Sequence, residues 1–210
     1  MLDGMTLSYE QATDKLLDAG ARFHSRGWVA ATGGNLSHRL DDGSVAITIS
    51  GRHKGELVGA DIMRVDMDGA SLDGKTPSAE TPLHTGLYKV RPDVNAILHS
   101  HPRSSIVYGL VNGGAASVTL TGYEFLKVFP GIHTHEAAVT LAIFPNSQDM
   151  TALQRDVGRW YAANPASPAV YLVRGHGLTV GAATIDAARY TTEAVEELLA
   201  YELERSRWAR

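Results

Sequence analysis

The sequence contains no cysteine among its 210 residues. Disulfides and thiolate metal sites are therefore excluded, and any metal would have to be held by histidine and carboxylate side chains. No apolar run approaches the roughly 20 residues that a membrane-spanning helix needs. Residues 1–4 also lack the basic and apolar regions of a signal peptide. We therefore expect a cytoplasmic protein with no membrane partner.

The charge of the chain excludes another class of partner. Its formal net charge is -4, and lysine and arginine residues form no local cluster, so no nucleic-acid surface is predicted. The hydrophobic content of 44% is enough for one sizeable core. Because no repeat, linker or low-complexity tract divides the chain, we expect a single domain over residues 1–210.

Residues 94–102 (VNAILHSHP) carry the strongest chemical signal. Residues 95–98 are typical of a short buried strand, and His99 and His101 follow at its end, before Pro102. Residues two apart on a strand point to the same face, so both imidazoles converge on one point. Two neutral imidazoles form half of a site for a divalent transition metal, whereas ordinary strand histidines are the alternative.

A third ligand is predicted far downstream. The apolar stretch 169–173 leads into Arg174-Gly175-His176-Gly177, where the glycines allow a tight hairpin that presents His176 openly. Three histidines without a fourth protein ligand are typical of a catalytic zinc site, whose open position takes water or substrate. A second His-x-His pair, His133 and His135, follows Pro130-Gly131, and we predict that these are polar loop residues rather than ligands.

Two turns are rich in small hydrogen-bond donors. One contains Gly33, Gly34 and Asn35; the other contains Ser50 and Gly51. Exposed backbone N–H groups and short polar side chains suit a phosphate or another oxyanion. For the first turn, a plain tight turn is the alternative.

Two carboxylates are candidates for proton transfer. Glu80 lies in a predicted helix start over residues 76–83, with Ser78 as the N-cap, so it either stabilises the first turn or lies near the metal. Glu124 lies between aromatic residues, a setting that could raise its pKa for use as a proton carrier. It could equally be a surface residue on a helical turn, and the sequence leaves both readings open.

The remaining pattern predicts scaffold. Ser8 and Gln11 have capping-box spacing at the start of a helix that carries Ala12, Leu16, Ala19 and Phe23 at helical intervals and ends at Gly27. Asn146 caps another helix, and a long helix closes the chain. Further strands are predicted at residues 45–49, 118–120 and 138–144. Together, an open metal site, donor-rich turns and spare carboxylates favour an enzyme that acts on a ketose phosphate.

The chain resembles the class II (zinc-dependent) aldolase and epimerase superfamily. The matching segments are residues 32–37, 47–51, 77–80, 99–101 and 175–177, in the family's order and across nearly the whole chain. The resemblance implies an α/β, three-layer, class II aldolase-like fold with a central, mostly antiparallel sheet flanked by helices. It also implies a homotetramer in which each active site lies between neighbouring subunits.

Within that superfamily, residues 121–127, 134–136 and 144–149 most resemble the methylthioribulose-1-phosphate dehydratases of methionine salvage. The resemblance implies one zinc ion per subunit on His99, His101 and His176. It places the dehydratases' acid/base glutamate on Glu124 and the aldolases' catalytic glutamate on Glu80, so it leaves open which one moves protons.

The resemblance also implies a substrate and a reaction. The substrate phosphate would be bound by Asn35, Ser50, Gly51 and Ser78. One of the aldolases' paired serines is Ala79 here, and Lys54 or Lys127 is the candidate replacement donor. The implied reaction is dehydration of 5-methylthioribulose 1-phosphate to 2,3-diketo-5-methylthiopentyl 1-phosphate. The alternatives are an aldolase or epimerase of another ketose phosphate, and a non-catalytic, adducin-like assembly domain.

Overall fold

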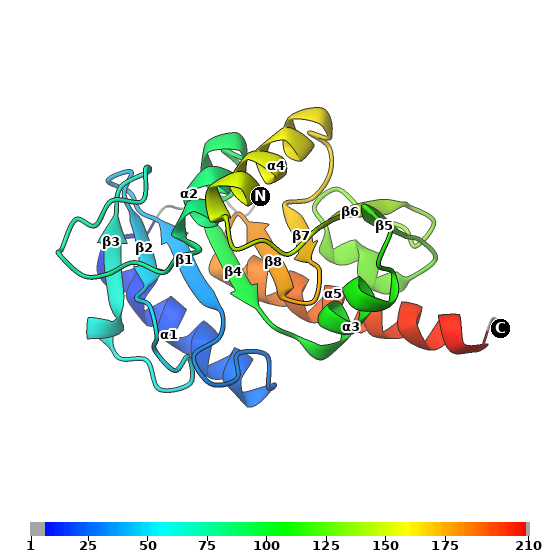
Figure 1. Ribbon diagram of the computed structural model, residues 1–210, viewed down its shortest axis with the longest axis horizontal. Coiled ribbons are helices and arrows are strands. Elements are labelled where there is room, and N and C mark those ends of the chain that lie inside the picture. Colours follow the sequence, from blue (N-terminus) through cyan, green and yellow to red (C-terminus); the bar gives the residue numbers. More distant parts are fainter. Residues whose placement is uncertain (1–6, 209–210) are drawn as a thin grey trace.

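The computed structural model describes residues 7–208, which form an eight-stranded sheet with helices on both faces (Figure 1). Residues 1–4, which argued against a signal peptide, lie outside this range. The strands follow the spatial order β3-β2-β1-β4-β8-β7-β6-β5, and every neighbouring pair is antiparallel except β6–β7. Their bounds are β1 Asn35–Arg39, β2 Val45–Thr48, β3 Ile62–Val65, β4 Ala96–Ser100, β5 Ser117–Leu120, β6 Val139–Phe144, β7 Val170–Val173 and β8 Gly177–Ala182. The predicted central, mostly antiparallel sheet is confirmed.

The helices form two outer layers. Helices α1 (Tyr9–Ser25), α3 (Arg103–Val111) and α5 (Ile185–Trp208) pack on one face, and α2 (Thr81–Val90) and α4 (Met150–Ala163) pack together on the other (Figure 1). Two short 3₁₀ helices, η1 (Gly59–Asp61) and η2 (Glu124–Val128), lie in the connections. Among residues 7–208, no helix combines the length and apolar character needed to cross a bilayer.

Strand alternation divides the core between the two faces of the sheet. On β4, Leu98 packs in the cluster under α1 and α5, whereas its neighbour Ile97 packs in the cluster under α2 and α4. Both side chains are fully buried. A strand covered on both faces needs apolar residues at successive positions, which is the pattern of the segment before His99.

The start of α1 follows directly from its sequence. Ser8 Oγ accepts a hydrogen bond from Gln11 N (3.3 Å), and Ser8 N donates to Gln11 Oε1 (3.1 Å), which completes a capping box. Ala12, Leu16 and Phe23 then lie fully buried against the sheet. The predicted N-cap and apolar face are confirmed.

Two predicted helix starts are wrong. Helix α2 begins at Thr81 with Glu80 at the N-cap position, so Ser78 is not the cap. Pro82 explains the boundary, because proline lacks an N–H and is favoured in the first helical turn. The α4 cap is Asp149, whose Oδ1 accepts from Ala152 N (2.9 Å), rather than Asn146. With α2 beginning at Thr81, the Glu80 side chain makes no capping hydrogen bond.

Helix α3 is anchored from another helix. Its N-cap residue, Pro102, has no side-chain acceptor, and Glu196 of α5 takes that role. The Glu196 carboxylate accepts from Ser104 N (2.7 Å), Ser105 N (3.0 Å) and Ser105 Oγ (2.9 Å). An anion suits these free N–H groups and the positive end of the helix dipole. This contact fixes the chain immediately after His101.

Candidate active site

Strand β4 positions the first two histidines. His99 lies within β4, paired with Asn35 of β1 on one side and Thr179 of β8 on the other. His101 follows the strand, and its N–H donates to Trp28 O (2.7 Å). Nε2 of His99 lies 3.1 Å from Nε2 of His101. The two-residue spacing therefore brings both rings to one place.

The β7–β8 hairpin delivers the third histidine. Gly175 adopts φ +67° in its turn, a conformation that glycine takes without strain. His176 follows, and its Nε2 lies 3.4 Å from Nε2 of His99. One ring nitrogen from each of His99, His101 and His176 lies within 4.8 Å of the other two, so the cluster could hold a metal ion.

The chemistry of this donor set fits a divalent metal. Nδ1 of His99 lies 3.1 Å from Leu178 O and 3.0 Å from Thr179 Oγ1. Its N–H therefore points to the carbonyl, and the lone pair of Nε2 faces the cluster. Burial lowers the pKa of His99 to about 3 and lowers that of His101, so both rings are neutral near pH 7. Neutral imidazole is the form that binds metals.

Two glycines make room for His101. A Cβ on Gly33 would lie 2.7 Å from His101 Nδ1, and a Cβ on Gly177 would lie 2.8 Å from His101 Cδ2. Either atom would be closer than a normal contact. The donor-rich turn before β1 therefore also fixes the position of a candidate ligand.

Glu80 lies beside the histidines. Its Oε1 is 3.0 Å from His176 Nε2, and its Oε2 is 3.6 Å from His99 Nε2 and accepts from Asn35 Nδ2. Burial acts to raise the pKa of Glu80, but the hydrogen bond with His176, the electrostatic interaction with the neighbouring histidine rings and the Asn35 amide outweigh it and lower that pKa below its usual range. Glu80 is therefore an ionised carboxylate next to a possible metal.

The predicted phosphate-binding residues come together. Asn35, Ser50, Gly51 and Ser78 line one hollow of about 270 Å³ that also touches Glu80 and His101. Lys54 forms part of the same wall. The residue is 2% exposed, and its Nζ donates to Thr32 O (3.0 Å) and Arg52 O (2.6 Å), one carbonyl beside each donor-rich turn.

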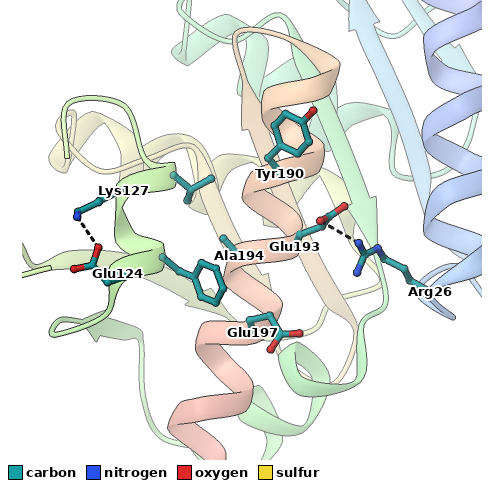
Figure 2. A pocket seen from close by; sticks show the side chains of 9 residues that line it. Arg26, Glu124, Lys127, Tyr190, Glu193, Ala194 and Glu197 are labelled. Atoms are coloured by element: carbon teal, nitrogen blue, oxygen red, sulfur yellow. Dashed lines mark ion pairs between the residues drawn. The ribbon is translucent and has the colours of Figure 1, made fainter. Parts of the chain in front are cut away.

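Glu124 lies elsewhere on the chain. It begins η2, its side chain is 70% exposed, and it pairs with Lys127 (2.5 Å; Figure 2). It also pairs with His135 (3.5 Å). It lines a separate hollow of about 350 Å³ with Phe125 and with residues of α5. Within residues 7–208, it makes no ion pair or hydrogen bond with the three histidines. Lys127, the other candidate replacement donor, does not line the 270 Å³ hollow around Asn35 among residues 7–208.

Of the two readings that the sequence left open for Glu124, the raised pKa is not found. The hydrogen bond and charge of Lys127 lower the pKa of this exposed carboxyl. The surface alternative therefore describes its surroundings. His133 and His135 are exposed residues of the loop before β6, as predicted.

The sequence patterns missed a buried polar group behind Asn35. His84 and Tyr88 of α2 and Ser37 of β1 are each at most 1% exposed and are linked by hydrogen bonds. A signal was present, since His84 and Tyr88 follow Glu80 at four-residue intervals, a spacing that puts side chains on one helical face.

Comparisons with known proteins identify the family of the chain. The family model for the class II aldolase and adducin N-terminal domain matches residues 14–203. The methylthioribulose-1-phosphate dehydratase of Gluconacetobacter diazotrophicus is 44% identical over 200 residues, covering 95% of this chain and 96% of the relative. The protein of the same name from Pseudomonas paraeruginosa is 46% identical over 197 residues, covering 92% and 94%.

A solved structure shares the fold. The crystal structure of L-fuculose-1-phosphate aldolase from Thermus thermophilus aligns with a TM-score of 0.76 at 20% identity. The alignment covers 96% of this chain and 98% of that one.

Proposed function

Because the chain belongs to the class II aldolase and adducin N-terminal domain family, we propose that it dehydrates 5-methylthioribulose 1-phosphate to 2,3-diketo-5-methylthiopentyl 1-phosphate, a step of methionine salvage. The observation that carries this proposal is the 44–46% identity, over more than nine-tenths of the chain, to proteins named methylthioribulose-1-phosphate dehydratase. The cytoplasmic location expected from the sequence stays a prediction.

The proposed metal is one zinc ion per subunit, held by His99, His101 and His176. The support is the convergence of three buried or half-buried imidazoles, at least two of them neutral, with no fourth histidine in the cluster among residues 7–208. A zinc ion there would polarise the C2 carbonyl and make the C3 proton more acidic.

The proposed phosphate site is the hollow beside that metal. Asn35, Ser50 and Ser78 offer side-chain donors, and Gly51 adopts φ +72° in a turn that leaves its backbone open. The buried ammonium of Lys54 adds positive charge in place of the missing serine hydroxyl at Ala79. Anchoring the phosphate here would lay the C2–C4 segment across the histidines.

The elimination then requires two proton transfers. A base removes the C3 proton, the C4 hydroxyl leaves with a proton from an acid, and water is released. The resulting C3 enol becomes the second ketone when its hydroxyl loses a proton and C4 gains one. Glu80 is ionised and near the histidines, so it is equipped to accept a proton. The family resemblance assigns an acid/base role to Glu124.

We further propose that Glu124 acts on the site of a neighbouring subunit in a homotetramer. The support is its exposure at the surface, away from the histidines of its own chain. Exposed apolar side chains nearby, such as Phe125 and Tyr201, suit a subunit contact. Each site would then combine metal ligands from one chain with Glu124 from the next.

The proposed reaction is tested with zinc-loaded protein and 5-methylthioribulose 1-phosphate. Diketone formation without aldehyde supports the dehydratase. Aldehyde together with dihydroxyacetone phosphate would instead assign an aldolase. A metal-free protein that is inactive on ketose phosphates would favour the adducin-like, non-catalytic alternative.

The test of the shared site uses mixed oligomers. Glu124→Gln and His176→Ala chains, each inactive alone, are co-expressed with different tags and purified through both. If Glu124 acts across the interface, about a quarter of the sites in a random mixture recover a complete set. If Glu124 acts within its own chain, no mixed oligomer regains activity.

A further inference from the structure

A chain of four hydrogen bonds connects the protein interior to Glu80. Tyr88 OH lies 2.8 Å from Ser37 Oγ, and Ser37 Oγ lies 2.7 Å from His84 Nδ1. His84 Nε2 then contacts Asn35 Oδ1, and Asn35 Nδ2 contacts Glu80 Oε2. Sequence-distant residues of β1 and α2 alternate along this chain.

Only one set of donors satisfies every member. The ionised Glu80 can only accept, so Asn35 must turn its N–H groups toward it. The amide oxygen of Asn35 then faces His84, so His84 must carry its proton on Nε2. Nδ1 of His84 is left as an acceptor for the Ser37 hydroxyl, which in turn accepts from Tyr88. In each of the four hydrogen bonds, therefore, the donor is the residue farther from Glu80 along the series.

Burial of these side chains preserves this assignment of donors and acceptors. His84 is 1% exposed, Ser37 is 0% exposed and Tyr88 is 1% exposed, so water does not compete for their bonds. Burial lowers the pKa of His84 to about 4, which keeps the ring neutral with a single N–H. Burial also raises the pKa of Tyr88, so its hydroxyl remains a donor.

The orientation of the Asn35 amide has a chemical consequence. Asn35 lines the hollow, and its Nδ2 also lies 3.4 Å from Ser78 Oγ. A reversed amide would place its oxygen against the Glu80 carboxylate and present an acceptor to the hollow. An anion such as phosphate needs donors there.

We propose that His84, supported by Ser37 and Tyr88, is a positioning residue that holds the Asn35 amide with its N–H groups toward Glu80 and the anion-binding hollow. The inference rests on the proposed phosphate site. It adds the residues that orient the hydrogen-bond donors of that site. His84 acts through Asn35 and does not touch the substrate.

The experiment measures the affinity of the full-length, zinc-loaded protein for inorganic phosphate, with KM for the ketose phosphate as a second readout. His84→Leu removes the N–H, whereas His84→Gln keeps an N–H donor at nearly the same place. Each change is also made in an Asn35→Ala background. Zinc content is measured for every variant.

We expect His84→Leu to weaken phosphate binding and raise KM roughly tenfold, with zinc retained. His84→Gln should restore most of the loss. In the Asn35→Ala background, His84→Leu should add almost nothing, because its effect passes through the amide. If His84→Leu does not fold, Ser37→Ala and Tyr88→Phe each remove one link with little change in volume and should give smaller losses of the same kind.

Additive losses in the double variant, or unchanged phosphate affinity in His84→Leu, would overturn the inference. So would a wild-type protein that binds no inorganic phosphate. Failure of the proposed function is distinguishable, since it would show as an inactive wild type whose phosphate affinity still depends on His84.

Discussion

Glu80 Oε1 lies 3.0 Å from His176 Nε2, although the two residues come from the start of α2 and from the β7–β8 turn. The contact exists because α2 begins only at Thr81, so the Glu80 side chain turns into the site instead of capping the helix. A carboxylate is thereby placed next to the candidate metal ligands without belonging to the cluster of three.

Glu80→Gln tests whether this carboxylate moves a proton. Glutamine keeps the size of the side chain and an oxygen that accepts from Asn35, but it removes the negative charge and the basicity. We expect kcat to fall by roughly 10²–10⁴ with zinc content unchanged. Steady-state kinetics with metal analysis provides the check. An unaltered kcat would leave proton transfer to Glu124 alone.

His176→Ala tests the metal site. Removing one of three ligands leaves only His99 and His101, so we expect most bound zinc to be lost on dialysis. His133→Ala is the matched control, because His133 is an exposed loop histidine and should retain wild-type zinc. Elemental analysis of both variants decides. Full zinc occupancy in His176→Ala would remove that residue from the ligand set.

The parts of the fold and site that depend on local periodicity could be predicted from the sequence. Strand alternation brings His99 and His101 to one place, because residues two apart share a face. The glycines around His176 indicated a tight hairpin, as found in the β7–β8 turn, where His176 is half-buried. Likewise, Ser8 and Gln11 formed the expected capping box, which needs only four consecutive residues.

The predictions that failed concern positions where two residues fitted the same role, or where the surroundings of a side chain are set by residues outside the local pattern. Both Ser78 and Glu80 fitted a helix start, and Pro82 decided between them. The surroundings of Glu124 could not be read from its aromatic neighbours, since Lys127, one helical turn away, determines its pKa. The His84 chain requires β1 to pack against α2, which no local pattern reveals.

Gly33→Ala tests the close approach of the turn before β1 to the metal site. The added Cβ would lie 2.7 Å from His101 Nδ1, so the ring or the turn has to move. We expect weaker zinc binding, by about tenfold or more, because ligands tolerate little displacement. Gly43→Ala is the control, since nothing lies within 4 Å of its added Cβ, although its φ of +82° costs some stability. Equal zinc affinities in the two variants would contradict the steric argument.

The pH dependence of stability should include a contribution from His38. Burial lowers its pKa from 6.5 to about 4, so the unfolded chain binds this proton first as the pH falls. The contribution is therefore complete above pH 6.5 and declines toward pH 4, by up to about 3 kcal/mol. His38→Gln should flatten the decline in the free energy of unfolding, measured by urea titration at several pH values. The exposed His133→Gln serves as control, and identical slopes in His38→Gln and wild type would refute the assignment.

Lys54→Met tests the buried ammonium in the wall of the phosphate hollow. Methionine preserves much of the length and apolar stem but removes the charge that lies beside both donor-rich turns. Lys75→Met is a close control. The Lys75 Nζ also donates to two backbone carbonyls, Ala60 O (2.8 Å) and Ile62 O (2.7 Å), but Lys75 does not line the hollow. Both substitutions should cost stability by loss of these bonds. Only Lys54→Met should also raise KM for the ketose phosphate and weaken inorganic phosphate binding, by roughly ten- to a hundredfold, with zinc retained. Kinetics and calorimetry on the two variants separate the roles. Equal KM values would reduce Lys54 to a structural cross-link between the turns.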